Sequence, residues 1–344
     1  MEALRKDLVL LASIFLLILF SLFVLSSLAP DVFPKYFLFI FVGLVAFFVF
    51  SQADFELLRV FSPHFYTVGI FFLILPLIIG EVTRGVVRWV PIGAFSVQPA
   101  EIARPFILLF LAYYWTSKEL NLKNFFLGTV YSALPVFLIL LQPSLGVAAV
   151  TLVGIGGLVL ALGFNKKILL PLVVLGAVAL PLLWSFMAPY QRARLAGFIS
   201  QTDPSGAGYN SIQSTISVGS GQLFGRGLGQ GVQTQLLFLP EKQTDFIFAS
   251  TAEELGFAGG VVLLVIIFVL LYRLALALYQ AKGYTERALA AGIFISIFTQ
   301  TTIHIGMNVG LLPITGLPLP LVSVGGSSFL GTMIFLGMSY SLRR

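Results

Sequence analysis

Ten long apolar runs restrict what this chain can fold into. They cover residues 8–28, 36–50, 65–80, 102–116, 125–141, 145–163, 168–189, 257–279, 288–308 and 321–341. A helix needs about 20 residues to cross the roughly 30 Å hydrocarbon core of a bilayer. Because 58% of the 344 residues are hydrophobic and only 10% are charged, the chain cannot coat a soluble globule of this size. We therefore predict one all-α polytopic membrane domain over residues 1–344, with about ten transmembrane helices.

The distribution of basic residues predicts the orientation of these helices. With the N-terminus inside, the inner connections carry twelve of the twenty Lys and Arg residues, and short basic connections are typical of the cytoplasmic side. Both termini are then cytoplasmic. A large extracytoplasmic loop, at about residues 190–256, follows the seventh helix and precedes the eighth, and loops of this length usually have a function.

The end of this loop is glycine-rich and polar over residues 217–256, which is typical of a binding segment rather than a membrane anchor. Asp245 is its candidate for chemistry, although Asp245 or Thr244 could instead cap a helix that starts near Phe246. Residues 246–255 are too few to span a bilayer and precede Gly256, so they could form a re-entrant half-helix against a polar interior.

Charged residues elsewhere form further candidates. Glu101 and Arg104 are three residues apart on one predicted helix face, where they can pair, and ionisable residues in a spanning helix usually have a function. The outer segments add candidates that could bind phosphate or anchor lipid head groups: Arg88, Trp89, Arg192, Arg194, Arg226 and Lys242. Zero cysteines exclude disulfides and thiolate chemistry.

Several motifs together resemble the SEDS family (shape, elongation, division and sporulation), and most closely its rod-shape members. They are Arg88-Trp89, Gln98-Pro99-Ala100-Glu101 with Arg104, Gln142-Pro143-Ser144-Leu145-Gly146, the run from Gly219 through Leu239-Pro240-Glu241 to Thr244-Asp245-Phe246-Ile247-Phe248-Ala249, Glu253-Glu254-Leu255-Gly256, and Pro313-Ile314-Thr315-Gly316-Leu317-Pro318 to Gly325-Gly326-Ser327-Ser328. The chain departs from the family pattern in four places, with Ala100 where the family usually has Ser, Arg104 for Lys, Ser144 for Asp and Val324 for Tyr.

The resemblance implies a peptidoglycan glycosyltransferase that polymerises lipid II on the outer face of the bacterial cytoplasmic membrane for cell elongation and shape. A class B penicillin-binding protein would be its transpeptidase partner, undecaprenyl-linked glycan and membrane lipid would be further contacts, and no nucleic acid is expected. In this reading Asp245 is the general base of an inverting reaction, Glu101 and Arg104 support it, and the basic residues offset the charge of the leaving diphosphate.

A divalent cation, Mg or Mn, could share the charge of that diphosphate, with Asp245 or Glu101 as an oxygen ligand. Two other functions stay open at this point. A lipid II flippase would also need ten helices with buried charges, although flippases need access from both faces and the inner connections here are short. A non-catalytic scaffold for the penicillin-binding protein would need only apolar helix faces.

Overall fold

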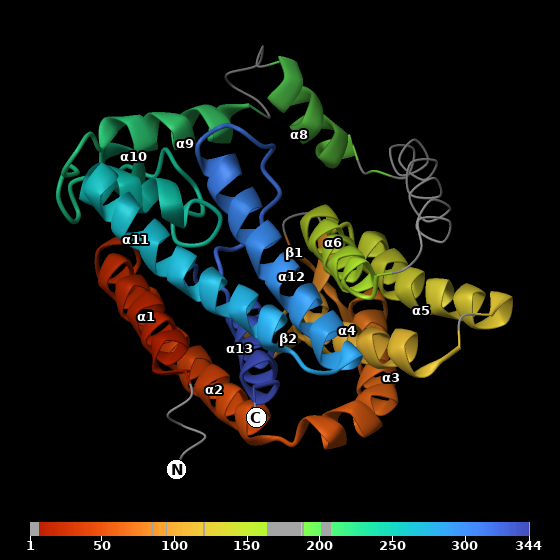
Figure 1. Ribbon diagram of the computed structural model, residues 1–344. Coiled ribbons are helices and arrows are strands. Elements are labelled where there is room, and N and C mark those ends of the chain that lie inside the picture. Colours follow the sequence, from red (N-terminus) through yellow and green to blue (C-terminus); the bar gives the residue numbers. More distant parts are fainter. Residues whose placement is uncertain are drawn as a thin grey trace.

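The computed structural model describes residues 7–83, 86–93, 95–119, 121–163, 187, 189–200 and 208–343, and this part of the chain is mainly helical (Figure 1). Its elements are α1 (Leu8–Leu28), a 3-10 turn η2 (Pro30–Val32), α2 (Phe33–Gln52), α3 (Phe55–Ile79), β1 (Glu81–Thr83), β2 (Val86–Ile92), β3 (Phe95–Val97), α4 (Pro99–Ser117), α5 (Leu122–Leu141), α6 (Leu145–Ala161), α8 (Pro189–Ser200), α9 (Tyr209–Ser220), α10 (Val232–Gln235), α11 (Ile247–Gln280), α12 (Tyr284–Asn308) and α13 (Gly326–Ser341).

Short polar side chains begin three of the outer helices. Asp7, Asp54 and Asn121 accept main-chain amides in the first turns of α1, α3 and α5, which satisfies donors that a helix leaves unpaired at its start. The runs that follow are mostly apolar. Local sequence therefore decides where these helices begin.

Six helical segments of the described chain are long and apolar enough to cross a membrane: α1, the segment Pro30–Gln52, α3, α5, α11 and α12. The predicted runs 102–116, 145–163 and 321–341 also contain helices, namely α4, α6 and α13. The predicted helix at 168–189 falls almost entirely outside the described residues. The protein is thus a multi-pass membrane protein, while the count of ten helices stays a prediction.

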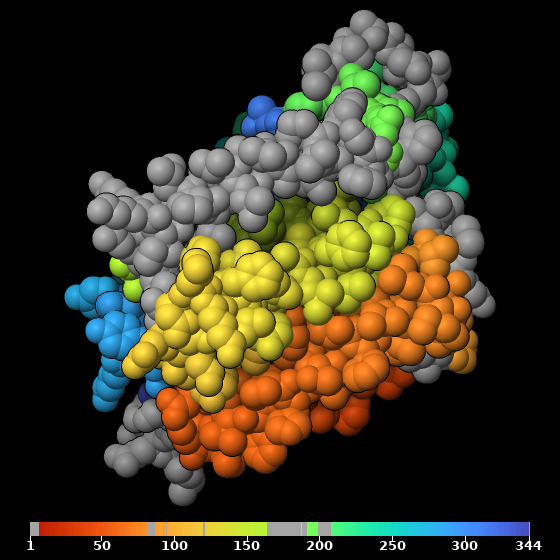
Figure 2. Space-filling view, turned by 90° about the vertical axis from the view of Figure 1, so that its right-hand side faces the viewer, coloured from red at the N-terminus to blue at the C-terminus, as the bar shows by residue number. Residues whose placement is uncertain are grey.

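Helices α4, α12 and α13 form the centre of the bundle. Nearly every residue of α13 is buried, with α2 and α4 packed against it, and α12 contacts α6 and α11. The outside is apolar instead of polar, with Phe71 on α3 and Phe126 on α5 each 66% exposed. Figure 2 shows this side, where α3, α5 and α6 adjoin. Such an apolar exterior fits a lipid environment.

The expectation of a purely helical protein is wrong at one place. The strands β1, β2 and β3 form an antiparallel sheet in that order, in which Val90 pairs with Val97 and Ile92 with Phe95. The run Val86-Val87-Arg88-Trp89-Val90 is β-branched and aromatic, which favours strand, and Gly93, with φ of 61°, makes the turn. The sequence pattern predicts only an outer connection between helices here.

The predicted break at Gly256 is confirmed. Gly256 has φ of 69° and ψ of −167° inside α11, and a side chain there would collide with the main chain of Phe224 and Gly225. The short part before the break begins at Ile247; its re-entrant position in the membrane stays a prediction. The N-cap residue of this helix is Phe246, whose side chain makes no capping hydrogen bond, and not Asp245 or Thr244 as the alternative had it.

Candidate active site

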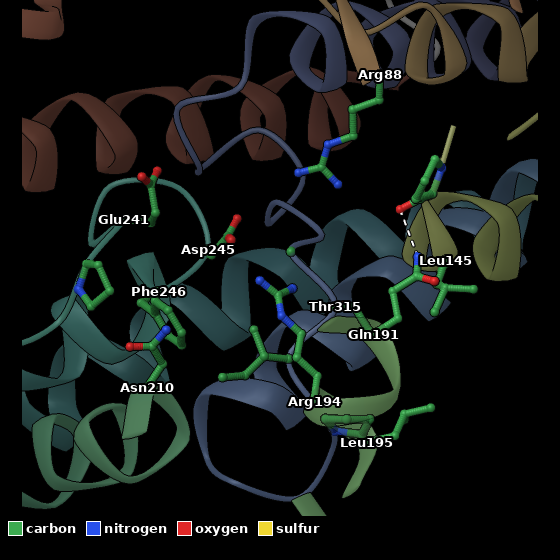
Figure 3. Close-up of a pocket in the computed structure, with 15 residues that line it drawn as sticks. Arg88, Leu145, Gln191, Arg194, Leu195, Asn210, Glu241, Asp245, Phe246 and Thr315 are labelled. Atoms are coloured by element: carbon green, nitrogen blue, oxygen red, sulfur yellow. Dashed lines mark hydrogen bonds between the residues drawn. The ribbon is translucent and has the colours of Figure 1, made fainter. Parts of the chain in front are cut away.

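A cavity of about 190 Å³ lies where the long loop meets β2, the α5–α6 turn and the segment after α12 (Figure 3). Charged groups of both signs line it: Arg88 from β2, Arg194 from α8, and Glu241 and Asp245 from the segment before α11. The other lining residues are Pro143, Leu145, Gln191, Leu195, Asn210, Pro240, Phe246, Pro313, Ile314, Thr315 and Gly316.

Hydrogen bonds to the main chain on both sides fix the position of Asp245. The buried side chain of Asn308, the last residue of α12, donates from Nδ2 to the Asp245 carbonyl oxygen (3.0 Å) and accepts the Ala249 amide at Oδ1 (2.9 Å). The Ser323 hydroxyl donates to the Thr244 carbonyl oxygen (2.7 Å). Both peptide groups beside the carboxylate-bearing residue are therefore anchored to distant parts of the chain.

Gly316 and Glu241 line the cavity next to Asp245. Gly316 has φ of 71°, and a side chain there would begin 3.4 Å from an Asp245 carboxylate oxygen, so glycine allows the chain to pass close to Asp245. Glu241 also has positive φ, 53°, and its Oε2 accepts the Thr244 hydroxyl at 2.9 Å. Sequence reasoning assigned Glu241 no role, although it lies in the quoted Leu239-Pro240-Glu241 motif.

Two of the predicted arginines reach the cavity from separate elements. Figure 3 shows the guanidinium groups of Arg88 and Arg194 pointing toward the space in front of Asp245, with Arg194 entering from α8. On α8, the side-chain amide of Gln191 donates to the Pro143 carbonyl oxygen (3.0 Å) and connects this helix to the α5–α6 turn. The cavity therefore presents two cations and two carboxylates at its surface.

The remaining predicted basic residues and Trp89 do not line the cavity. Trp89 follows Arg88 on β2, so its side chain points to the other face of the strand. Arg192 is half-buried on α8, and Arg226 is exposed. Lys242 donates to the Thr234 carbonyl oxygen at 2.9 Å, and burial lowers the pKa of this amine, while nearby glutamates oppose the shift.

Glu101 and Arg104 lie in the core of the bundle, not at the cavity. Both side chains are 1% exposed and their charged groups are 3.0 Å apart. Arg104 also donates to Gln300 Oε1 at 2.8 Å, and its guanidinium lies 5.7 Å from the centre of the Phe335 ring. A buried pair of this kind costs desolvation energy that its own attraction scarcely repays, so stability is a weak reason for its presence.

Gln300 connects this ion pair to the segment that supports Asp245. Its side-chain amide donates to the Pro318 carbonyl oxygen (2.9 Å) and to the Ser328 hydroxyl (3.2 Å). Five residues after Pro318, Ser323 bonds to Thr244 next to Asp245. These hydrogen bonds link the ion pair to the cavity through the segment 317–325.

The described residues contain no group of three or more His, Asp or Glu side chains suited to a metal ion. Glu241 and Asp245 are nevertheless two carboxylates at one cavity, and hard divalent cations prefer such oxygen ligands. Glu101 lies at a different place, in the bundle core. A cation at the cavity would thus take Asp245 and Glu241 as its protein ligands.

The fold and cavity define a helical membrane protein with a charged site built around one aspartate. The family model described as "Cell cycle protein", for FtsW, RodA and SpoVE, matches residues 4–344. The chain therefore belongs to this family, the SEDS family that its motifs resemble.

Two curated relatives cover most of the chain. The peptidoglycan glycosyltransferase MrdB of Escherichia coli K12 is 38% identical over 307 residues, which are 88% of this chain and 82% of that protein. Stage V sporulation protein E of Bacillus subtilis 168 is 35% identical over 314 residues, covering 88% and 84%.

Solved structures share the fold over nearly the whole length. A chain of a peptidoglycan synthase complex, described as coordinating polymerization and crosslinking, superimposes with a TM-score of 0.81 at 30% identity, over 97% of this chain and 96% of that one. The Thermus thermophilus rod-shape-determining protein RodA gives a TM-score of 0.72 at 24% identity, over 97% and 95%.

Proposed function

We propose that this protein is a peptidoglycan glycosyltransferase that polymerises lipid II into glycan strands for cell elongation and shape. The observation that carries the proposal is the cavity in which Asp245 stands beside Arg88 and Arg194. A reaction between lipid-linked sugars needs a base for a hydroxyl group and cations for a diphosphate leaving group. The membership of the SEDS family, with relatives named for this activity, supports the same conclusion.

In the proposed mechanism the Asp245 carboxylate accepts the proton of the attacking sugar hydroxyl. The hydroxyl oxygen bonds to the anomeric carbon of the second sugar from the face opposite the diphosphate, and the diphosphate leaves with the bonding electron pair, so the configuration inverts. General-base catalysis of this kind contributes about 10²–10⁴-fold. Arg88 and Arg194 stabilise the charge that develops on the leaving diphosphate.

The proposal includes a divalent cation in this cavity that binds the oxygen atoms of the diphosphate. It would be held by Asp245 and Glu241 and would share the negative charge of the leaving group. Loss of polymerisation on chelation, with recovery on adding Mg²⁺ or Mn²⁺, is the expected result. Unchanged polymerisation in a chelator would remove the cation from the proposal.

The same proposal places the protein in the bacterial cytoplasmic membrane with both termini inside and the cavity facing outward. A class B penicillin-binding protein is then the partner, because the solved complex with this fold coordinates polymerization with crosslinking. The basic inner connections support this orientation. Accessibility of single cysteines at Gln230 and Lys118, probed from outside intact cells with a charged thiol reagent, tests it; labelling at 118 alone would reverse the orientation.

The decisive experiment is polymerisation of purified lipid II by the protein with its penicillin-binding partner. Asp245→Asn removes the base and retains the shape of the side chain, and Asp31→Asn makes the same chemical change at an exposed position in η2. We expect glycan strands from wild type and Asp31→Asn, and none from folded Asp245→Asn.

The alternatives give different results in this experiment. A scaffold would leave polymerisation unaffected by Asp245→Asn. A flippase would move lipid II across liposomes unchanged and would yield no glycan strands even as wild type. Melting temperatures of the variants in detergent establish that they are folded.

A further inference from the structure

We propose that a turn of the long loop, here called the apolar turn and carrying Leu223, Phe224 and Leu228, inserts into the bilayer surface at the end of α1 and contacts lipid directly. These side chains are 63%, 84% and 41% exposed, in a segment that is otherwise glycine and polar residues. Large apolar side chains gathered in an exposed turn usually mark a binding surface. The proposal is independent of the catalytic role of Asp245.

The apolar turn is attached to the point where the long part of α11 begins. The amides of Phe257 and Ala258, which lose helical partners at the Gly256 break, donate to the carbonyl oxygens of Gln222 (2.8 Å) and Leu223 (3.0 Å). The apolar turn therefore caps the membrane-spanning part of α11. Its height relative to the bilayer is set by that helix.

The exposed face of α11 continues from the apolar turn without interruption. Phe257 (67% exposed), Val261 (37%), Val265 (55%) and Phe268 (68%) recur at helical spacing and lie on one side of the helix. This stripe belongs to a candidate membrane span and faces lipid. Because Leu223 lies beside the first residues of the stripe, the same lipid surface extends onto the apolar turn.

The C-terminal end of α1 lies next to the apolar turn. The hydroxyl of Ser27, in the last turn of α1, donates to Glu254 Oε1 (2.7 Å), and that oxygen also accepts the amide of Gly229 (3.1 Å). Two spanning helices, α1 and α11, thus meet at the apolar turn. A segment at the ends of two spanning helices lies at the boundary of the hydrocarbon core.

The composition of the apolar turn fits lipid better than a protein partner. The exposed Arg226 lies between Phe224 and Leu228, an arrangement in which apolar side chains enter the bilayer while the guanidinium reaches phosphate groups of lipids. No acidic side chain occurs between Ser220 and Leu239. A bilayer surface with anionic lipids is therefore its complementary partner.

The absence of cysteine from the chain permits a direct test. Single-cysteine variants Phe224→Cys and Leu228→Cys carry a nitroxide label in nanodiscs of phosphatidylethanolamine and phosphatidylglycerol. Collision rates with oxygen, which concentrates in hydrocarbon, and with a water-soluble nickel chelate then report depth. Phe268→Cys, about 16 Å along α11 from Phe257, is the control for a position in lipid. Lys118→Cys, in an exposed connection, is the control for a position in water.

We expect oxygen collisions to exceed nickel collisions at positions 224 and 228, as at 268, with a smaller ratio because the apolar turn is shallow. Nickel collisions that exceed oxygen collisions at both positions, as at 118, would overturn the proposal. So would labels that become protected only when the penicillin-binding protein is added, since the surface would then bind protein. Leu223→Cys replaces either variant that fails to fold.

Discussion

Replacing Asn308 by alanine is expected to displace Asp245 and to reduce both the rate of polymerisation and the stability of the protein. The substitution removes the donor to the Asp245 carbonyl oxygen and the acceptor of the Ala249 amide. Ala249 lies in the first turn of α11 and is fully buried, so its amide loses the partner that a helix start cannot supply. Each buried polar group left unpaired costs about 1–3 kcal/mol.

Together these two losses predict a decrease of about 2–6 kcal/mol in the free energy of unfolding. The effect on the reaction comes from geometry, because a displacement of about 1 Å at a catalytic group can cost about 10²-fold in rate. We therefore expect kcat to fall about 100-fold with little change in KM for lipid II, since Arg88 and Arg194 are untouched. Glycan strands and melting temperature are measured on the same preparation.

Ser214→Ala provides the matched control. The Ser214 hydroxyl donates to the Asn308 carbonyl oxygen at 2.8 Å, so its removal weakens the same helix end but leaves intact the hydrogen bonds of the Asn308 side chain to Asp245 and Ala249. This variant should lose about 1 kcal/mol of stability and keep its polymerisation rate. If Asn308→Ala is folded and polymerises lipid II at the wild-type rate, the positioning argument is refuted.

Four other predictions follow from the described contacts. Arg194→Ala should lower kcat/KM roughly 10-fold to 100-fold by removing charge-assisted contacts, while Arg192→Ala, two residues away and outside the cavity, should not; equal losses would contradict the assignment. Glu101→Ala should lower the free energy of unfolding by about 3–5 kcal/mol, because it leaves the buried guanidinium of Arg104 without its carboxylate. A melting temperature equal to that of wild type would contradict this prediction. Gly256→Ala should lower the free energy of unfolding by at least about 2 kcal/mol because only glycine suits its backbone angles, as melting curves would show. Burial lowers the pKa of Lys242 in the folded state below its usual 10.5. At a pH between the folded-state and unfolded-state pKa values, the unfolded state binds more protons than the folded state, so the free energy of unfolding should rise as the pH increases towards 10.5. In Lys242→Met this part of the pH dependence should vanish.

The membrane architecture was largely predictable because hydrophobicity is a local property of the sequence. Each predicted run within the described residues contains a helix. The break at Gly256 was predictable for the same reason, since glycine allows backbone angles that other residues avoid. The sheet at residues 81–97 was missed because a short strand in a connection has no hydrophobic period long enough to recognise.

The candidate site was predictable only in part. Asp245, Arg88 and Arg194 were proposed and lie at one cavity, whereas Glu101 and Arg104 were proposed and lie in the core. Residue type and family motif indicate that a charge matters, but they do not tell whether it faces a cavity or another helix. Asn308 stood beside the closing motif, yet its contact with Asp245 spans 63 residues of sequence.

The sequence by itself determined that this protein is a membrane-embedded helical bundle with a polar, glycine-rich loop before the long helix α11. The reason is that apolar composition, helix caps and glycine act within a few neighbouring residues. Only the tertiary structure decided which charges meet. Arg88, Arg194 and Asp245 come from a strand, a loop helix and a turn, and their meeting depends on how helices with similar apolar surfaces pack, which no local pattern specifies.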